Sequence, residues 1–111
     1  MDPIRPVDPT WQATVMVCCN QRPEGSEKAS CGRERGAELR AWIKARSREE
    51  GLKGRVLVAE TSCLGVCSPL GVMVVAMSAR AGRRGWVVPP DADREALWQE
   101  IRGVVTEERP L

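Results

Sequence analysis

Cysteines are the residues of this chain whose type and spacing can support chemistry. There are five of them, Cys18, Cys19, Cys31, Cys63 and Cys67. Cysteine thiolates bind zinc and iron-sulfur clusters, and pairs of thiols carry out redox exchange. The chain has no histidine, so an imidazole can be neither a metal ligand nor a general base. That absence excludes Ser-His and Cys-His catalytic arrangements and leaves metal binding or thiol chemistry.

The spacing of four cysteines narrows the choice of metal. Twelve residues separate Cys18 from Cys31, whereas three separate Cys63 from Cys67. Structural zinc sites usually come as two tight pairs, with about two to four residues between the cysteines of each pair. Plant-type ferredoxins crowd three cysteines into one loop, and this chain does not. The pattern favours an iron-sulfur cluster, while a zinc-stabilised structural or interaction module and a thiol-based redox protein stay open.

Two glycines and the expected start of a helix lie close to these cysteines in the sequence. Gly65 permits a tight turn between the last two, and Gly71 frees the exit of their loop, as needed where backbone N–H groups approach a cluster's sulfurs. An oxidised [2Fe-2S] core on four thiolates is an anion. The N-terminus of a helix after Cys31 would offset that charge through its dipole, with Arg33 or Arg35 adding positive charge. Taken singly, each glycine also suits an ordinary turn and each arginine a solvated surface.

Hydrophobic periodicity predicts the elements that must position the cysteines. Apolar and β-branched runs predict strands at residues 14–19, 55–60, 72–77 and 86–88, with a turn at 79–85. A helical pattern begins at Ala37 and is stopped by Gly51. A second helix is expected after Asp91 as its N-cap. Its expected buried face consists of Leu97, Ile101 and Val104.

The order of these elements explains how distant cysteines can meet. Strand, helix, strand, strand, strand, helix predicts a small α/β layer whose first two strands are parallel and joined by a crossover helix. In such a pair the C-terminal ends of both strands and the N-terminus of the helix lie at one edge of the sheet. Cys18 closes the first strand, Cys31 precedes the helix, and Cys63 and Cys67 follow the second strand. All four can therefore converge.

Composition limits the class of protein. The 111 residues, 42% hydrophobic and 29% charged, fit one globular domain without a membrane-spanning run. The net charge of +2, from 17 basic and 15 acidic residues, does not predict nucleic-acid binding. The first ten residues lack the apolar centre of a secretory signal, so we expect a cytoplasmic protein, where structural disulfides are disfavoured.

The segments around the cysteines resemble a known family, the thioredoxin-like [2Fe-2S] ferredoxins of bacteria. The likeness rests on four stretches of sequence: Val17-Cys18 with Gln21-Arg22-Pro23, Ser30-Cys31-Gly32, SCLGVC at 62–67, and Gly71-Val72. Together they look like the family's C-x12-C, long gap, C-x3-C pattern. The resemblance covers residues 14–105. It implies that one [2Fe-2S] cluster is held by Cys18, Cys31, Cys63 and Cys67.

The resemblance also implies a fold and a role. The fold would be thioredoxin-like, with a small mixed four-stranded sheet and flanking helices. The role would be one-electron transfer between redox partner proteins, without an enzymatic reaction or thioredoxin activity, since no CxxC motif is present. Residues 1–13 would then be an extended proline-containing arm, 14–105 the ferredoxin domain and 106–111 a tail. The C-L-G-x-C segment also looks like the small flavin-adjacent subunit of NADH dehydrogenases, but that subunit has a shorter first cysteine gap.

The family resemblance further implies a homodimer. Tryptophan is enriched at interfaces because of its large apolar area. Of the four tryptophans, Trp42 and Trp98 are expected in the core, which leaves Trp11 and Trp86 as interface candidates.

Adjacent Cys18 and Cys19 raise a question of assignment. Neighbours on a strand point to opposite faces, so both cannot easily bind one cluster. Cys18 is the expected ligand because it shares a face with Met16 and gives the family's twelve-residue gap to Cys31. Cys19 is then expected to be a small buried hydrophobe, the alternative being a spare thiol beside the cluster.

Overall fold

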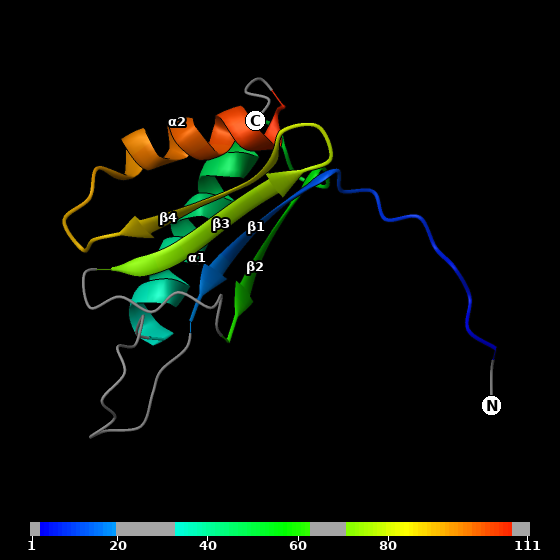
Figure 1. The fold of residues 1–111 in the computed structure, drawn as a ribbon, viewed down its shortest axis with the longest axis horizontal. Helices are drawn as coiled ribbons and strands as arrows, with labels where there is room; N and C mark the ends of the chain where they lie inside the picture. The colour runs from blue at the N-terminus through cyan, green and yellow to red at the C-terminus, as the bar shows by residue number, and fades with distance from the viewer. Residues whose placement is uncertain (1–2, 20–32, 63–70, 108–111) are drawn as a thin grey trace.

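The computed structural model describes residues 3–19, 33–62 and 71–107. In chain order the elements are β1 (Ala13–Cys18), α1 (Arg33–Glu49), β2 (Val56–Thr61), β3 (Val72–Ser78), β4 (Gly82–Val88) and α2 (Arg94–Val105). They build a four-stranded sheet of order β2-β1-β3-β4 (Figure 1). Strand β1 is parallel to β2 and antiparallel to β3, which is antiparallel to β4. The expected mixed sheet, with a parallel first pair joined by a helix, is confirmed.

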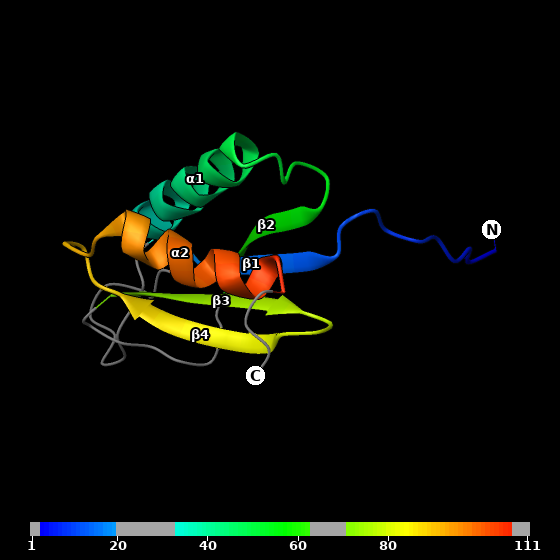
Figure 2. The ribbon, with the colours of Figure 1, turned by 90° about the horizontal axis from the view of Figure 1, so that it is seen from above.

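Alternation along the strands divides the sheet into two unlike faces. One face is buried, and both helices lie on its side of the sheet (Figure 2). Its fully buried side chains include Val15, Val17 and Val74. The opposite face, here called the open face, carries apolar side chains that are less buried. These are Met16, Leu57, Ala59, Met73, Val75, Met77 and Val87.

Helix α1 begins earlier than its hydrophobic pattern indicates. It starts at Arg33 rather than at residue 37. The hydrophobic pattern does not indicate this first turn, because the turn holds no large apolar residue. Its end matches the expectation, since Gly51 adopts a φ of 74°. The N–H of Gly51 donates to the Arg48 carbonyl at 3.0 Å, and that of Leu52 to the Ser47 carbonyl at 3.0 Å. This pair of bonds is a Schellman motif, which satisfies the last carbonyls of a helix.

Helix α2 is capped two residues later than expected. Asp93, not Asp91, is the N-cap, and its carboxylate accepts the N–H groups of Glu95 at 3.0 Å and Ala96 at 3.2 Å. Those two donors have no partner within the helix, so an acceptor at this position stabilises its first turn. The expected buried face is confirmed. Leu97, Ile101 and Val104 are buried, as is Trp98.

Strand β4 is longer than its sequence suggests. It begins at Gly82, so the connection from β3 is shorter than the turn expected over residues 79–85. Arg83 and Arg84 made this segment resemble a turn. Cross-strand pairing nevertheless continues from Val72 opposite Val88 to Ser78 opposite Gly82. An edge strand tolerates such charges because one side of it faces solvent.

The N-terminal residues lie away from the sheet. Residues 3–12 contain no helix or strand, and Ile4 and Val7 are 100% and 83% exposed (Figure 1). Prolines at every third position favour such an extended course. Neither helix of the described residues has both the length and the apolar composition of a membrane span.

Candidate metal centre

Four chain segments that border the expected ligands meet at one edge of the sheet. Strands β1 and β2 run parallel, so their C-terminal ends lie together there, with the beginning of α1 beside them (Figure 1). Strand β3 runs antiparallel to β1 and pairs Val74 with Val17, so its first residues lie at the same edge. The structure therefore places Cys18, Ser62, the start of α1 and the start of β3 at one edge, while the convergence of all four cysteines stays a prediction.

Cys18 is the expected ligand that the structure describes. It is fully buried and lies opposite Thr61 on the parallel strand. Its Sγ lies 3.9 Å from the carbonyl oxygen of Ser62. Ser62 directly precedes Cys63 in the sequence, so the end of β1 lies beside the residue that leads to Cys63.

Cys19 has a different environment, and it is half-buried rather than buried as expected. Its N–H donates to the Thr61 carbonyl at 2.8 Å, and its thiol points back to the Val17 carbonyl at 3.7 Å. Burial raises the pKa of the Cys19 thiol to about 11, and a hydrogen bond to Glu60 and the negative charge of that carboxylate act in the same direction. Arg40 opposes this pKa shift. The Cys19 thiol is therefore protonated at neutral pH, as suits a structural cysteine.

Gly36 fixes the beginning of α1 against the end of β1, and sequence reasoning did not single it out. A Cβ atom at this position would overlap the carbonyl oxygen of Cys18 and lie 2.9 Å from the Sγ of Cys19. Only a residue without a side chain lets the two backbones approach so closely. A glycine in the first turn of a helix that follows a cysteine was the available signal.

Gly71 is required directly before β3. A Cβ atom there would overlap the carbonyl group of Val88 and lie 2.7 Å from the Pro89 nitrogen. The expected need for glycine at this position is thus explained by the packing of the start of β3 against the end of β4.

The other expected site residues lie outside the described residues. These are Cys31, Cys63, Cys67 and Gly65. Within residues 3–19, 33–62 and 71–107, no group of three or more histidine, cysteine, aspartate or glutamate side chains is placed to hold a metal ion. The four-cysteine ligand set therefore stays a prediction. Arg35 is exposed and lines a shallow hollow with Glu38 and Arg94.

The described part of the edge suits an anionic cluster. Cys18 supplies a buried sulfur, and Gly36 brings the N-terminus of α1 against the end of β1. A helix N-terminus carries partial positive charge and N–H groups without partners inside the helix. Such an arrangement can stabilise a group with thiolate and sulfide charge.

Comparisons with known proteins give one kind of match. No family model matches the sequence, and neither does any curated protein. Among solved structures, the thioredoxin-like [2Fe-2S] ferredoxin of Aquifex aeolicus superimposes with a TM-score of 0.65 at 19% identity, over 91% of this chain and 92% of that chain. A second structure of such a ferredoxin from the same organism gives 0.63 at 19% identity, over 91% and 86%. A cysteine-to-serine variant gives 0.62 at 19% identity, over 89% and 92%. The chain therefore has the fold of the thioredoxin-like [2Fe-2S] ferredoxins.

Proposed function

We propose that this chain is a cytoplasmic electron carrier that holds one [2Fe-2S] cluster on Cys18, Cys31, Cys63 and Cys67. The cluster, when bound, supplies one-electron redox chemistry. The protein's part is to hold the irons by thiolates, to shield them and to present them to redox partner proteins.

The observation that carries this proposal is the position of Cys18. It is a fully buried cysteine at the carboxyl end of β1, where β2 ends and α1 and β3 begin. The sequence places the remaining three expected ligands next to these same ends: Cys31 two residues before α1, Cys63 after Ser62, and Cys67 four residues before Gly71. The likeness of fold to [2Fe-2S] ferredoxins supports the same cofactor.

The test is the metal content and spectrum of protein purified without oxygen from cells competent for cluster assembly. We expect about two irons and two acid-labile sulfides per chain, visible absorption, and uptake of one electron per cluster. One zinc per chain without sulfide would support a zinc-stabilised module instead. A metal-free protein with a reversible disulfide would indicate thiol redox chemistry.

We also propose that the protein is a homodimer formed through the open face of the sheet. This face carries partly exposed apolar side chains on all four strands, with Leu57 and Val87 each 39% exposed. Apolar side chains gathered on one exposed face often mark an interface. Of the tryptophans suggested for the interface, Trp11 is 42% exposed, whereas Trp86 is half-buried against the core. Trp11 is thus the better candidate of the two.

A further inference from the structure

Charge on α1 is divided between two flanks of the helix. On the flank near α2, the acidic side chains that the structure describes on α1, and that of the residue after it, each have an arginine partner. The pairs are Glu38 with Arg94 at 3.0 Å, Glu49 with Arg46 at 3.5 Å, and Glu50 with Arg102 at 2.7 Å. Arg46 also binds Glu95 of α2 at 2.7 Å. These acidic charges are therefore neutralised locally, and they join the two helices.

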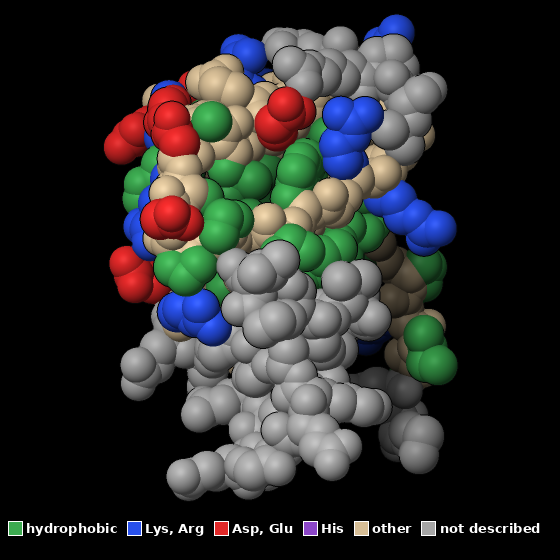
Figure 3. Space-filling model, turned by 60° about the vertical axis from the view of Figure 1, so that its left-hand side comes forward, with side chains coloured by type: hydrophobic (Ala, Val, Ile, Leu, Met, Phe, Trp, Pro, Cys, Tyr) green, Lys and Arg blue, Asp and Glu red, His purple; other side chains and the backbone are tan. Residues whose placement is uncertain are grey.

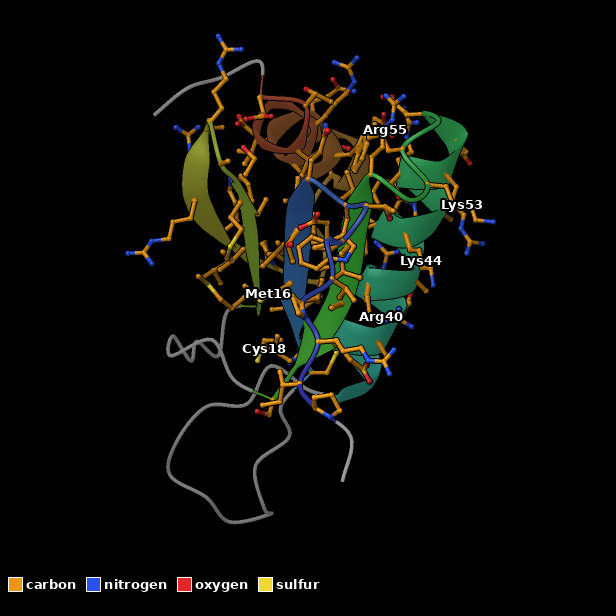
Figure 4. The ribbon with its side chains drawn as sticks, turned by 90° about the vertical axis from the view of Figure 1, so that its right-hand side faces the viewer. Met16, Cys18, Arg40, Lys44, Lys53 and Arg55 are labelled. Atoms are coloured by element: carbon orange, nitrogen blue, oxygen red, sulfur yellow. The ribbon has the colours of Figure 1, made fainter. Side chains whose placement is uncertain are left out.

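The other flank of α1, toward β2, is basic. Arg40, Lys44 and Arg48 follow one another at intervals of four residues, so they lie along one side of the helix over about 12 Å. Lys53 and Arg55 continue the charge in the connection to β2. Figure 4 shows four of these residues on the same side of the molecule. We call all five the basic flank.

Most of the basic flank is not engaged in ion pairs. Lys44, Arg48, Lys53 and Arg55 are exposed, and none forms an ion pair within the described parts of the chain. Unpaired basic side chains gathered on one surface create a positive potential that reaches a Debye length into solvent. The net charge of +2, summed over the whole chain, does not reveal that these basic side chains lie together on one surface.

The basic flank begins at the edge that holds Cys18. The Arg40 Nε lies 4.0 Å from the Glu60 carboxylate, and Glu60 pairs in register with Val17, the neighbour of Cys18. Cys18 and Arg40 accordingly lie near each other at the same end of the molecule in Figure 4. Hydrophobic side chains instead gather on the side that holds the start of α2 and the end of β4 (Figure 3).

We propose that the basic flank is the docking surface for an acidic patch on a redox partner protein. This inference rests on the proposed electron-carrier function and adds the chemistry of the partner. Opposite charges steer two proteins together and fix their orientation. Docking at the Arg40 end of this flank would bring the partner beside the edge with Cys18, whereas Lys53 and Arg55 lie toward the other end of β2. A nucleic acid is a poorer fit, because the stripe on α1 is short and the chain as a whole is nearly neutral, with 17 basic and 15 acidic residues.

The test uses an acidic flavodoxin as the partner and two double variants of equal net charge. The flank variant is Lys44→Glu and Lys53→Glu. The control is Arg5→Glu and Arg80→Glu, two exposed arginines on the arm and in the β3–β4 turn. At low salt we expect electron transfer to flavodoxin to slow roughly tenfold in the flank variant and by less than about threefold in the control. Equal slowing of both variants, or of neither, would overturn the proposal.

A second measurement separates docking from electron carriage. Backbone amide shifts of the unmodified protein are followed by NMR as oxidised flavodoxin is added, and we expect the changes at residues 40–55. Changes confined to α2 and β4 would overturn the proposal, as would flank shifts with a single-stranded oligonucleotide but none with flavodoxin. Cluster absorption and reduction by dithionite are measured first for every variant. If the unmodified protein shows no cluster absorption or is not reduced by dithionite, that result counts against the electron-carrier function. The NMR result then decides the docking surface.

Discussion

The backbone of Gly36 in α1 lies against the carbonyl oxygen of Cys18 at the end of β1. Both contacting groups belong to the backbone, so neither can move away by rotation of a side chain. A methyl group at position 36 should therefore push the helix away from the strand end. The position of α1 relative to the candidate cluster ligand depends on this glycine.

The first prediction is that Gly36→Ala lowers the free energy of unfolding by about 1 kcal/mol. Overpacking costs about 1–3 kcal/mol, whereas alanine favours a helix over glycine by about 1 kcal/mol, so the clash outweighs the gain in propensity. Urea denaturation measures the change. As a control, Ala41→Gly on the exposed side of α1 should cost about 1 kcal/mol through propensity alone and leave the visible spectrum unchanged. A Gly36→Ala protein as stable as the original would contradict the contact.

The second prediction separates the adjacent cysteines. Cys18→Ser should shift the absorption and reduction potential of the cluster or abolish its binding, because an alkoxide suits iron less well than a thiolate. Cys19→Ser should leave the spectrum nearly unchanged, since the Cys19 thiol is protonated and directed to the Val17 carbonyl. Absorption spectra of both variants, prepared identically, measure the difference. Bleaching of the Cys19 variant alone would reverse the ligand assignment.

The third prediction concerns acid stability. The hydrogen bond from Arg102 lowers the pKa of Glu50 below its ordinary 4.5, and the hydrogen bond from Arg46 lowers that of Glu95. A lowered pKa in the folded state means that these ion pairs stabilise the protein above pH 4.5 and stop doing so as the pH falls through the folded pKa values. Unfolding free energy should therefore fall on acidification below pH 4.5.

The matched variant for this prediction removes both carboxylates. Glu50→Gln with Glu95→Gln should be less stable at neutral pH and should lose less stability between pH 5 and 3 than the original chain. The effect should be small and should weaken in salt, because the pairs are near the surface. Identical acid curves for both proteins would show that the pairs contribute nothing.

The fourth prediction tests the proposed homodimer. Val75 lies in the middle of the open face, opposite Met16 on β1 and Gly85 on β4. A lysine there would bury a charge in the proposed interface, so Val75→Lys should halve the mass measured by light scattering. Ala45→Lys, which adds the same charge at an exposed position of α1, should leave the mass unchanged. A monomeric mass for the original chain at all concentrations would contradict the proposal directly.

The sequence predicted the topology because that depends on patterns that are local. Alternating valines in the first strands, Gly51 at the end of α1 and the apolar spacing of α2 each indicate an element without reference to its neighbours. Their order then leaves few ways to connect a parallel pair. The start of α1 and the length of β4 were misjudged, because their residues are polar and are stabilised by packing and pairing with other elements.

The site was predicted less completely for the same reason. The position of Cys18 at a strand end follows from its own neighbours in sequence. Gly36 contacts Cys18, and Gly71 contacts Val88, although the partners are far apart in the sequence. Such contacts cannot be inferred from the composition of either segment. The charge of α1 shows a further limit. A count of basic and acidic residues reports balance, whereas helix geometry gathers Arg40, Lys44 and Arg48 on one flank, away from the ion pairs of the other.

The charged side chains on the two flanks of α1 have different roles, and this difference affects which substitutions the chain can accept during evolution. Ion pairs that hold the helices together, such as Arg46 with Glu95, lie on one flank, whereas Lys44 and Lys53 lie on the other and contribute no ion pair within the described residues. Substitutions on the basic flank therefore alter recognition at little cost in stability. A lineage could exchange one redox partner for another by mutating exposed lysines, and a protein engineer could redirect electrons along the same route.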